Sequence, residues 1–466
     1  MMDVRSGLRS IDARLALTKL AGYPFALATW VGEDGYPLSV AVDVTVDPSS
    51  GTASFVVPGG LVMPSTGEMS LTGSHIRPQP GVGYDERRHV TLWGGLDRDR
   101  AGWITVRPTA AWGWDESEEP FPEYVERSVG QSRRYLGQLS SELGRTVRPR
   151  LSAGWLFLRA TRLPFLSAAI VPVTIGIAIA AVGGLFDPLT ALLTIIGAAS
   201  AHLAFNVAND IFDTRLGADE LNVNPTQYSG GSRVIQYGLV SMRGMQGLLV
   251  LFLALAVSIG LLLFALSPST QLLVIGVLGV ILGVGYTAPP LKLVYRGLGE
   301  LTIAVGFGPL MLLGAYVVQS GGPIDVAAVV ASLPVAILVA LILYVNEVPD
   351  RPGDSRAGKR TLVVRFSRGT VIALYDVAIV AAFAIIIIGV VLRVLPLPAL
   401  LAVLAAPLAL RVHRGLNVSY DQPYALMAVM ATNIRIHLVV GLVLLGTYLS
   451  VLLVQALAPG RSLFLP

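Results

Sequence analysis

Long apolar runs fill the sequence from residue 163 onward. A transmembrane helix needs roughly 20 consecutive apolar residues, and this stretch contains a succession of runs of that length. The runs between polar breaks predict about nine helices in an all-α membrane bundle. These helices are expected at 163–184, 188–208, 245–266, 271–288, 299–319, 325–345, 370–392, 397–412 and 433–457.

Charge is distributed unevenly along the chain, which predicts more than one domain. Charged residues make up 14% of the chain, whereas soluble domains carry about 25%. Residues 1–150 nevertheless have an ordinary charge density. We therefore expect a soluble domain over 1–148, a basic linker over 149–162 and a membrane domain over 163–466.

Basic residues gather on one side of the predicted bundle. If the N-terminus is cytoplasmic, the connections on that side hold most arginines and lysines of the membrane part, and the other side keeps little more than Arg393 and Arg461. The positive-inside rule then predicts a multi-pass protein of the cell membrane with a cytoplasmic soluble domain. Residues 1–22 contain no continuous apolar core, so we expect no cleavable signal peptide.

Two clusters of aspartate and asparagine follow apolar runs, "NVANDIFDTRLGAD" from residue 206 and "NEVPDRPGD" from residue 346. A charge at the bilayer centre costs at least about 2.5–3.5 kcal/mol, which favours a functional role. Residues four apart share a helix face, and the matching spacing of the two clusters indicates an internal repeat. The shared faces carry Asn206 with Asp210, Asn209 with Asp213, and Asn346 with Asp350 and Asp354.

Both clusters are predicted to lie at helix ends that line a cavity on the cytoplasmic side. Gly217 is expected to end the first helix, and Pro349 and Pro352 are expected to end or loosen the second. Irregular backbone at membrane depth is tolerated where it lines a cavity. Two alternatives remain open: ordinary loop acids at the membrane surface, and the substrate site of a transporter, although transporters usually place such acids near the midplane.

The residues around the clusters indicate a site for a metal-bound diphosphate. The chain has no cysteine, and no histidine accompanies these carboxylates, a combination that favours Mg²⁺ with phosphate oxygens. Lys359 and Arg360 follow the second cluster, and "SGGSRV" with Arg233 follows the first, so both supply groups suited to phosphate. We therefore expect a diphosphate attached to an apolar group, with an apolar chamber that shields a carbocation from water.

Over roughly 155–457 the chain resembles the UbiA-type family of intramembrane prenyltransferases, through "NDIFD", "NEVPDRPGDSRAGKRTL", "YTAPPLKLVYRGLGE" and "LRATRLPF". The resemblance implies nine transmembrane helices around a central cavity and Mg²⁺-dependent transfer of a prenyl chain from its diphosphate to an acceptor, commonly an aromatic ring. A strict repeat would place an acid at Gly217, but the acid comes at Asp219. That spacing is most similar to the branch that prenylates 1,4-dihydroxy-2-naphthoate in menaquinone biosynthesis.

The resemblance also implies roles for individual residues. The expected partners are a prenyl diphosphate, a lipophilic aromatic acceptor and membrane lipid, and no nucleic acid is expected. Asn209, Asp213, Asn346, Asp350 and Asp354 would hold Mg²⁺-diphosphate, with Asp210 and Asp219 supporting the first metal site and Asn206 on the substrate side; Lys359, Arg360 and Arg233 would steady the diphosphate, Tyr286 would flank the cation or acceptor, and Arg159 or Arg162 would contact the acceptor.

The N-terminal part is predicted to be a small β-barrel closed by a helix near 122–143. Short β-rich runs lie at 25–31, 38–46, 52–57, 89–96 and 103–108, with turns at "EDG" and "DPSSG". Through "RRHVTLWGGL" and "WGWDE" this part is similar to flavin-binding split barrels of the pyridoxamine-phosphate-oxidase type.

That similarity leaves two interpretations of the N-terminal domain open. Arg77, Arg87, Arg88 and His89 could serve the phosphate of FMN or another flavin, and the protein would then be a membrane-anchored oxidoreductase of quinone-like substrates or would carry both activities. Alternatively, the barrel is a scaffold or partner site without a cofactor, and His75 and His89 are structural residues.

Overall fold

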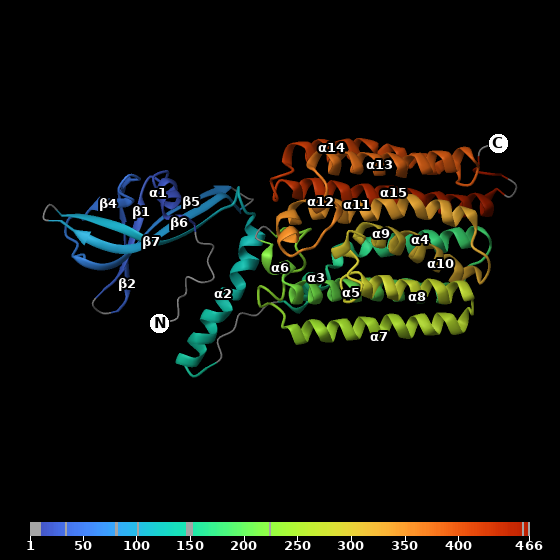
Figure 1. Cartoon of the computed structure of the whole chain (residues 1–466), viewed down its shortest axis with the longest axis horizontal. Coiled ribbons are helices and arrows are strands. Elements are labelled where there is room, and N and C mark those ends of the chain that lie inside the picture. Colours follow the sequence, from blue (N-terminus) through green and yellow to red (C-terminus); the bar gives the residue numbers. More distant parts are fainter. Residues whose placement is uncertain are drawn as a thin grey trace. The chain divides into compact units, whose positions relative to one another are not determined.

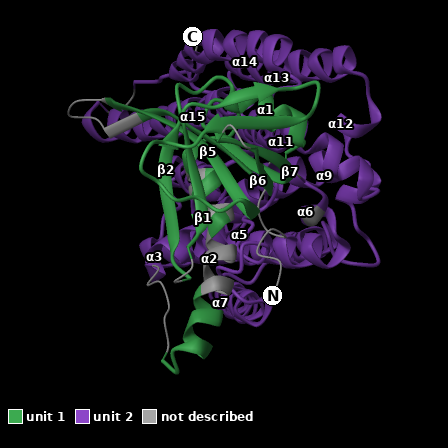
Figure 2. Ribbon diagram, turned by 90° about the vertical axis from the view of Figure 1, so that its left-hand side faces the viewer, with its two compact units in different colours: residues 1–145 green, residues 146–466 purple. Residues whose placement is uncertain are grey.

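The structure is a computed structural model, and it describes residues 11–32, 35–79, 83–99, 102–145, 152–222, 225–458 and 461–464. The chain separates into two compact units, residues 1–145 and 146–466 (Figure 2). The first unit is built around a β-sheet and the second is a helical bundle.

One antiparallel sheet organises the first unit, with the strand order β2-β1-β5-β6-β7-β4-β3 (Figure 1). Only residues 43 and 44 separate the two edge strands, β2 and β3, so the sheet must curl until its edges approach each other. The inner side chains form one core. The strands are β1 (Ala26–Val31), β2 (Pro37–Val42), β3 (Thr45–Asp47), β4 (Thr52–Val56), β5 (Thr66–Gln79), β6 (Gly83–Arg98) and β7 (Trp103–Asp115).

The strand predictions are confirmed in part. The single strand expected at 38–46 is two strands, β2 and β3, and the long strand β5 was missed because its glycines and polar residues break the apolar alternation. The turn predicted at "DPSSG" is confirmed, since Asp47 pairs with Thr52 across it. The predicted "EDG" turn includes residues 33 and 34, which lie outside the described residues.

The helix in the sheet core is α1 (Ala13–Leu20), not the one expected. Asp12 caps α1 by accepting the N–H groups of Arg14 and Leu15, and Leu17 and Leu20 are buried in the core. The helix predicted near 122–143 exists as α2 (Phe121–Glu142), but its described residues are absent from that core. Its first turn packs on the sheet outside that core, since Tyr124 stacks on Trp114 of β7 at a centroid distance of 4.5 Å, and the closure of the barrel by α2 stays a prediction.

The second unit contains seven described helical stretches long and apolar enough to cross a membrane, and two apolar helices of 16 residues, α4 and α8. All nine predicted segments overlap these stretches, but α4 and α8 are shorter than the roughly 20 residues of a typical span, so nine spans are not confirmed. The bounds are α4 (Ser167–Val182), α5 (Pro188–Leu216), α7 (Met242–Leu266), α8 (Thr270–Gly285), α9 (Gly299–Val305), η4 (Gly306–Leu310), α10 (Met311–Ser320), α11 (Val326–Arg356), α13 (Arg368–Val391), η5 (Leu397–Ala405), α14 (Ala406–Ser419) and α15 (Leu426–Leu457).

Short elements at one end of the bundle connect these helices. The segment expected as a linker over 149–162 contains a helix, α3, because Ser152 caps its start through the N–H of Trp155. The C-terminus lies at the opposite end of the bundle from α6 and α12 (Figure 1). The short elements are α3 (Ala153–Thr161), η2 (Leu163–Leu166), α6 (Ala218–Leu221), η3 (Val294–Arg296) and α12 (Leu362–Arg365).

The helices α5 and α11 carry the two acid clusters and end differently from each other. Gly217, with φ of 78°, ends α5 in the left-handed conformation, as predicted. In contrast, α11 continues through Pro349 and Pro352 to Arg356, so these prolines do not end it, and the alternative that they loosen it stays a prediction. Each proline removes one helical hydrogen bond, but the packing of the surrounding helices keeps this segment helical.

Burial separates the inner helices from the outer ones. The largest core cluster includes Leu338 on α11, Tyr375 on α13 and Ile436 on α15. By contrast, only 17% of the most apolar window of α7 is buried, against 56% for α11. A helix that is apolar all round and little buried by protein is suited to contact with lipid.

Candidate active site

The polar ends of α5 and α11 line one cavity of about 830 Å³. From α5 come Asn206, Asn209 and Asp213, and the predicted ladder of Asn346, Asp350 and Asp354 on α11 also lies in its wall. The two clusters therefore meet, although they are far apart in the sequence. Among the described lining residues, the carboxyl groups belong to Asp213, Asp219, Glu347, Asp350 and Asp354, and the cationic side chains to Arg162 and Lys359.

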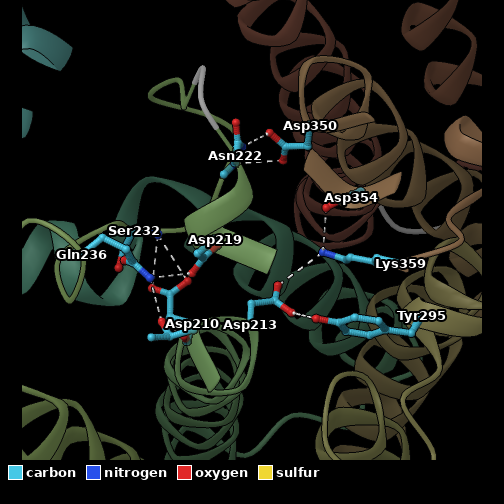
Figure 3. Close-up of polar contacts among 12 residues, drawn as sticks. Asp210, Asp213, Asp219, Asn222, Ser232, Gln236, Tyr295, Asp350, Asp354 and Lys359 are labelled. Carbon is cyan, nitrogen blue, oxygen red and sulfur yellow. Dashed lines mark hydrogen bonds and ion pairs between the residues drawn. The ribbon is translucent and has the colours of Figure 1, made fainter. Parts of the chain in front are cut away.

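Asp213 is held from two sides (Figure 3). The hydroxyl of Tyr295 donates a hydrogen bond of 2.8 Å to Oδ1 of Asp213, and Lys359 Nζ lies 3.3 Å from Oδ2. The carboxylate is buried, so both contacts act with little screening by water. Its orientation is set before any ligand binds.

Lys359 lies between the two acid clusters. Its Nζ is 3.3 Å from Asp213 Oδ2 and 3.8 Å from Asp354 Oδ1. Burial alone would lower the pKa of Lys359, but the carboxylates of Asp213 and Asp354 outweigh burial, and the pKa is raised well above its usual value. Lys359 is therefore a fixed positive charge in the cavity wall.

A loop with two left-handed glycines joins the clusters. Gly230 donates its N–H to Asp350 Oδ2 over 2.9 Å, and Ser232 donates its N–H to both carboxylate oxygens of Asp210 at 3.2 Å. Gly230 and Gly231 have φ of 75° and 72°. A Cβ on Gly231 would lie 2.9 Å from Asp219 Oδ1, so this position requires glycine both for its φ and for its close approach to the acids.

Asp210 and Asp219 hold this loop in place. Asp210 is buried and absent from the described cavity wall, and Asp219 accepts a hydrogen bond of 3.3 Å from Gln236 Nε2. Arg233 NH1 donates to the backbone carbonyl of Asp219. Burial raises the pKa of Asp219 well above its usual value, and the nearby carboxylates of Asp213 and Asp210 raise it further.

Asp350 is anchored on the opposite side of the cavity. Besides the N–H of Gly230, Asn222 Nδ2 donates to Asp350 Oδ1 over 2.8 Å (Figure 3). Gly353 of α11 packs against Asn222, because a Cβ at Gly353 would lie 3.0 Å from Asn222 Cα. Close packing of α11 against the segment after α6 thus fixes this acid.

The remaining predicted residues divide into two groups. Tyr286 and Arg162 line the cavity, and Arg162 NH2 donates to the carbonyl of Tyr228 over 3.4 Å. Arg159, Arg233 and Arg360 are absent from the described lining, and the side chain of Arg360 is exposed. The structure therefore brings Arg162 rather than Arg159, and Lys359 rather than Arg360, to the cavity.

Sequence reasoning missed several residues of this site. Tyr295 lies within a quoted motif but gave no signal that its hydroxyl reaches Asp213, and Asn222 stands in a loop without a recognisable pattern. Glu347 lines the cavity beside the ladder, and His202 lies two turns before Asn209 on α5. His202 could have been found as a polar residue within an apolar run.

The free oxygen atoms of the site suit Mg²⁺ with phosphate as a co-ligand. Asn209 Oδ1, Asn346 Oδ1 and Asp354 Oδ2 are buried and have no hydrogen-bond partner among the described residues. Within the described ranges, no three acidic, histidine or cysteine residues are close enough to hold a metal ion by themselves. Mg²⁺ commonly takes one or two carboxylates and completes its shell with substrate phosphates and water, so this donor set fits.

The rest of the cavity is apolar. Its wall continues along α7 and α8 with aliphatic and aromatic side chains such as Leu261, Phe264, Leu273 and Val277. The cavity therefore has a charged end and a long apolar part, which suits a ligand that carries a charged group on a hydrocarbon chain.

The residues considered for a flavin phosphate in the first unit are engaged elsewhere. Arg77 forms ion pairs of 2.8 Å with Asp85 and Glu86, and Arg87 pairs with Glu116. His89 packs against the rings of Trp114 and Tyr124 at centroid distances of 6.3 and 6.1 Å. Two of the three arginines are thus neutralised by carboxylates, and no described contact favours a phosphate there.

Comparisons with known proteins give concordant matches. A sequence model of the UbiA prenyltransferase family matches residues 169–434. The chain is 28% identical over 312 residues to a 2-carboxy-1,4-naphthoquinone phytyltransferase of Synechocystis sp., covering 66% of this chain and 97% of that protein. It is 33% identical over 217 residues to a 1,4-dihydroxy-2-naphthoate octaprenyltransferase of Escherichia coli, covering 45% and 68%. A solved UbiA homologue from Archaeoglobus fulgidus bound to GPP and Mg²⁺ matches with a TM-score of 0.41 and 15% identity, over 64% of this chain and 98% of that one.

Proposed function

Because the chain belongs to the UbiA prenyltransferase family, we propose that it transfers an isoprenoid group from its diphosphate to a naphthoate-type aromatic acceptor. The names of two relatives specify such acceptors, 2-carboxy-1,4-naphthoquinone and 1,4-dihydroxy-2-naphthoate. The observation that carries the proposal is one cavity with both acid clusters and Lys359 at one end and apolar side chains along the rest.

The charge balance of the cavity supports a metal-bound diphosphate. Five carboxyl groups and two cations are found in its described wall, so a diphosphate alone would be repelled. Asp213, Asp350 and Asp354, with the amide oxygens of Asn209 and Asn346, would hold Mg²⁺ and through it the diphosphate. When bound, Mg²⁺ neutralises the charge that develops on the leaving diphosphate.

The protein's own groups would assist the departure of the diphosphate. Lys359 places a permanent positive charge between Asp213 and Asp354, where it can pair with a diphosphate oxygen. The loop with Gly230 and Gly231 keeps Asp350 and Asp210 in position. Arg233 and Arg360 would act from outside the cavity wall, by supporting this loop and by raising the local positive potential.

The apolar part of the cavity would hold the isoprenoid chain and exclude water. As the bond between C1 and the diphosphate oxygen breaks, positive charge develops on the allylic carbons, and exclusion of water protects them from hydrolysis. A new bond then joins C1 to a ring carbon of the acceptor, and this carbon regains its place in the aromatic ring by losing the group that it carried, a proton to the departed diphosphate or the carboxylate as CO₂. Arg162 lies in the cavity wall and suits the acceptor carboxylate, and Tyr286 offers an aromatic face to the cation.

Two other functions have less support. A transporter would not require Lys359 and two acid clusters at the same end of the cavity, and the relatives carry transferase names. A flavin oxidoreductase would need a phosphate site in the first unit, where Arg77 and Arg87 are paired with carboxylates. We further propose that the acid clusters and the first unit face the cytoplasm, on the basis of the distribution of arginine and lysine.

The test is a transfer assay with the full-length protein in detergent. Geranylgeranyl diphosphate and 1,4-dihydroxy-2-naphthoate are supplied with Mg²⁺ or with EDTA, and prenylated product is followed by mass spectrometry. We expect Mg²⁺-dependent product, and a loss of at least about 100-fold in Asp350→Asn. Asp421→Asn, which changes an exposed carboxylate on the same protein, is the matched control. Full activity in EDTA, or in Asp350→Asn, would refute the proposed site.

A further inference from the structure

His202 lies in the cavity wall, further from the end of α5 than the acid cluster of that helix. It lies on α5, eleven residues before Asp213, a separation of about 16 Å along the helix axis. The side chain is 4% exposed, and its ring meets the ring of Phe307 edge-on at a centroid distance of 5.3 Å. A histidine at this depth needs a polar partner, because an unsatisfied buried polar group is costly.

The hydrogen bonds of Asn206 determine which nitrogen of His202 carries the proton. Asn206 Nδ2 lies 3.3 Å from the carbonyl oxygen of Thr161, which can only accept, so this end of the amide is the donor. The same Nδ2 lies 3.0 Å from His202 Nε2, which must therefore be the bare, accepting nitrogen. In neutral imidazole the proton then resides on Nδ1.

His202 Nδ1 is thus a hydrogen-bond donor without a partner. It is buried, and it makes no hydrogen bond to any described residue. Leaving such a donor unsatisfied costs about 1–3 kcal/mol, so a ligand that accepts from it gains affinity. His202 is one of the residues that line the cavity, so this donor belongs to a side chain that borders the space of a cavity ligand.

The neighbouring ring of Phe307 is placed by an irregular segment. Phe307 belongs to η4, a π-helical turn between α9 and α10. Gly308 in this turn packs directly on α11, because a Cβ there would lie 2.3 Å from Ala336 Cβ. Such π-helical turns are frequent at functional sites. His202 and Phe307 together form a subsite with one aromatic edge and one polar N–H.

The remaining question is which ligand supplies the accepting oxygen. An isoprenoid chain carries no oxygen or nitrogen. The diphosphate would be bound at Asn209, Asp213 and Asp350. Even Asn209 lies about 10 Å from His202 along the helix axis, which is longer than a diphosphate. We propose that the Nδ1–H of His202 binds a ring oxygen of the aromatic acceptor, which makes His202 a specificity-determining residue. This inference rests on the proposed function.

The experiment compares the full-length wild type with His202→Phe, using the assay above. We expect the KM for 1,4-dihydroxy-2-naphthoate to rise about ten-fold and the KM for geranylgeranyl diphosphate to stay within two-fold. Ser200→Ala is the matched control, because Ser200 is also a buried polar residue of α5 but is absent from the described cavity wall. It should leave both KM values unchanged.

Two analogues, 1-hydroxy-2-naphthoate and 4-hydroxy-2-naphthoate, locate the contacted oxygen by competition. For the analogue that keeps this oxygen, Ki should rise about ten-fold in His202→Phe, and for the other it should not change. His202→Gln retains an N–H and should recover much of the loss. Equal effects on both analogues, or no effect on either, would overturn the inference and indicate a structural or water-bonded histidine.

If His202→Phe does not fold, a measurement on the wild type can still test whether the Nδ1–H of His202 binds the acceptor. In protein with ¹⁵N-labelled histidine, the Nδ1–H signal of His202 is assigned by its absence in His202→Gln. It should shift on addition of the naphthoate but not of inorganic diphosphate with Mg²⁺, and the reverse pattern would refute the inference. If the wild type forms no product with the naphthoate, the proposed function fails; if product forms and His202→Phe behaves as wild type, only this inference fails.

Discussion

The carboxylate of Asp213 takes its orientation from side chains that lie 82 and 146 positions further along the chain. Tyr295 supplies a neutral donor and Lys359 a charged one, so the acid is held without being neutralised completely. The acid itself could be predicted from its spacing, since a carboxylate after an apolar run has few structural uses. Tyr295 could not, because nothing local distinguishes a tyrosine that reaches a distant acid from one that packs in a core.

At the residue scale we predict that Tyr295→Phe weakens the response to metal. The hydroxyl positions Asp213 without lining the cavity, and loss of such an outer contact typically costs 10–100-fold in metal affinity. The Mg²⁺ concentration for half-maximal activity should rise about ten-fold, with an unchanged KM for the acceptor, in a titration with Mg²⁺. The control is Tyr448→Phe, which removes a buried hydroxyl without a hydrogen-bond partner in the described part of the chain. If Tyr295→Phe lowers kcat but leaves the half-maximal Mg²⁺ concentration unchanged, the proposal that Tyr295 positions Asp213 for the metal is contradicted.

At the scale of elements, the sequence indicated the backbone donors of the glycine loop but not where α11 ends. The glycines of "SGGSRV" indicated backbone donors for a phosphate, and in the structure the N–H groups of Gly230 and Ser232 donate to the carboxylates of Asp350 and Asp210. The end of α11 was mispredicted, because the prolines at 349 and 352 argue locally for a break. Contacts with Asn222 and with the neighbouring helices outweigh that local preference, and they keep Asp354 on the same face as Asp350.

Alanine substitutions at Gly217 and Gly231 should distinguish the effect of backbone strain on stability from the effect of a new Cβ on the geometry of the site. Gly217 and Gly231 both have left-handed φ, so alanine costs about 1–2 kcal/mol at either position. Only at Gly231 would the new Cβ meet Asp219 and Asp210, since the space beside Gly217 is open. We expect both variants to melt earlier, but only Gly231→Ala to raise the KM for prenyl diphosphate several-fold. Comparable KM values in the two variants would contradict this assignment.

At the scale of the whole molecule, charge and hydropathy divide the chain before any contact is considered. The first unit holds most of the acidic residues and five of the six tryptophans, and the second holds the apolar helices. Within the second unit, α6 and α12 lie at one end and the C-terminus at the other (Figure 1). We make two predictions at this scale, one about which side of the membrane each end of the bundle faces and one about how the stability of the first unit depends on pH.

Single cysteines should report the sidedness of the membrane unit, because the chain has none of its own. Ser355, at the end of α11, and Ser462, near the C-terminus, are both exposed. A membrane-impermeant maleimide should label Ser355→Cys in inverted vesicles and Ser462→Cys in intact cells. Labelling in the opposite pattern would reverse the proposed orientation, while the catalytic proposal would be unaffected.

Acid should destabilise the first unit through His89. Burial lowers the pKa of His89 below its usual 6.5, so the folded state binds fewer protons than the unfolded state. The stability that His89 contributes is therefore complete above pH 6.5 and is lost as the pH falls through that value. Urea unfolding followed by tryptophan fluorescence between pH 8 and pH 5 should show this loss, with a smaller loss in His89→Gln. The control is His75→Gln, which changes a half-buried histidine of the same sheet. A pH profile for His89→Gln identical to that of the wild type would exclude His89 as the cause.

The apolar runs, the approximate helix positions and the spacing of the two acid clusters follow from the sequence alone, because hydropathy and i, i+4 spacing are local properties of the chain. The place of α1 in the sheet core, the continuation of α11 and the contacts of Tyr295 and Asn222 were decided by the tertiary structure. The tertiary structure also decided that Lys359 and Arg162, rather than Arg360 and Arg159, line the cavity. In each of these cases the deciding energy is a contact between segments far apart in the chain, and no local pattern records such contacts.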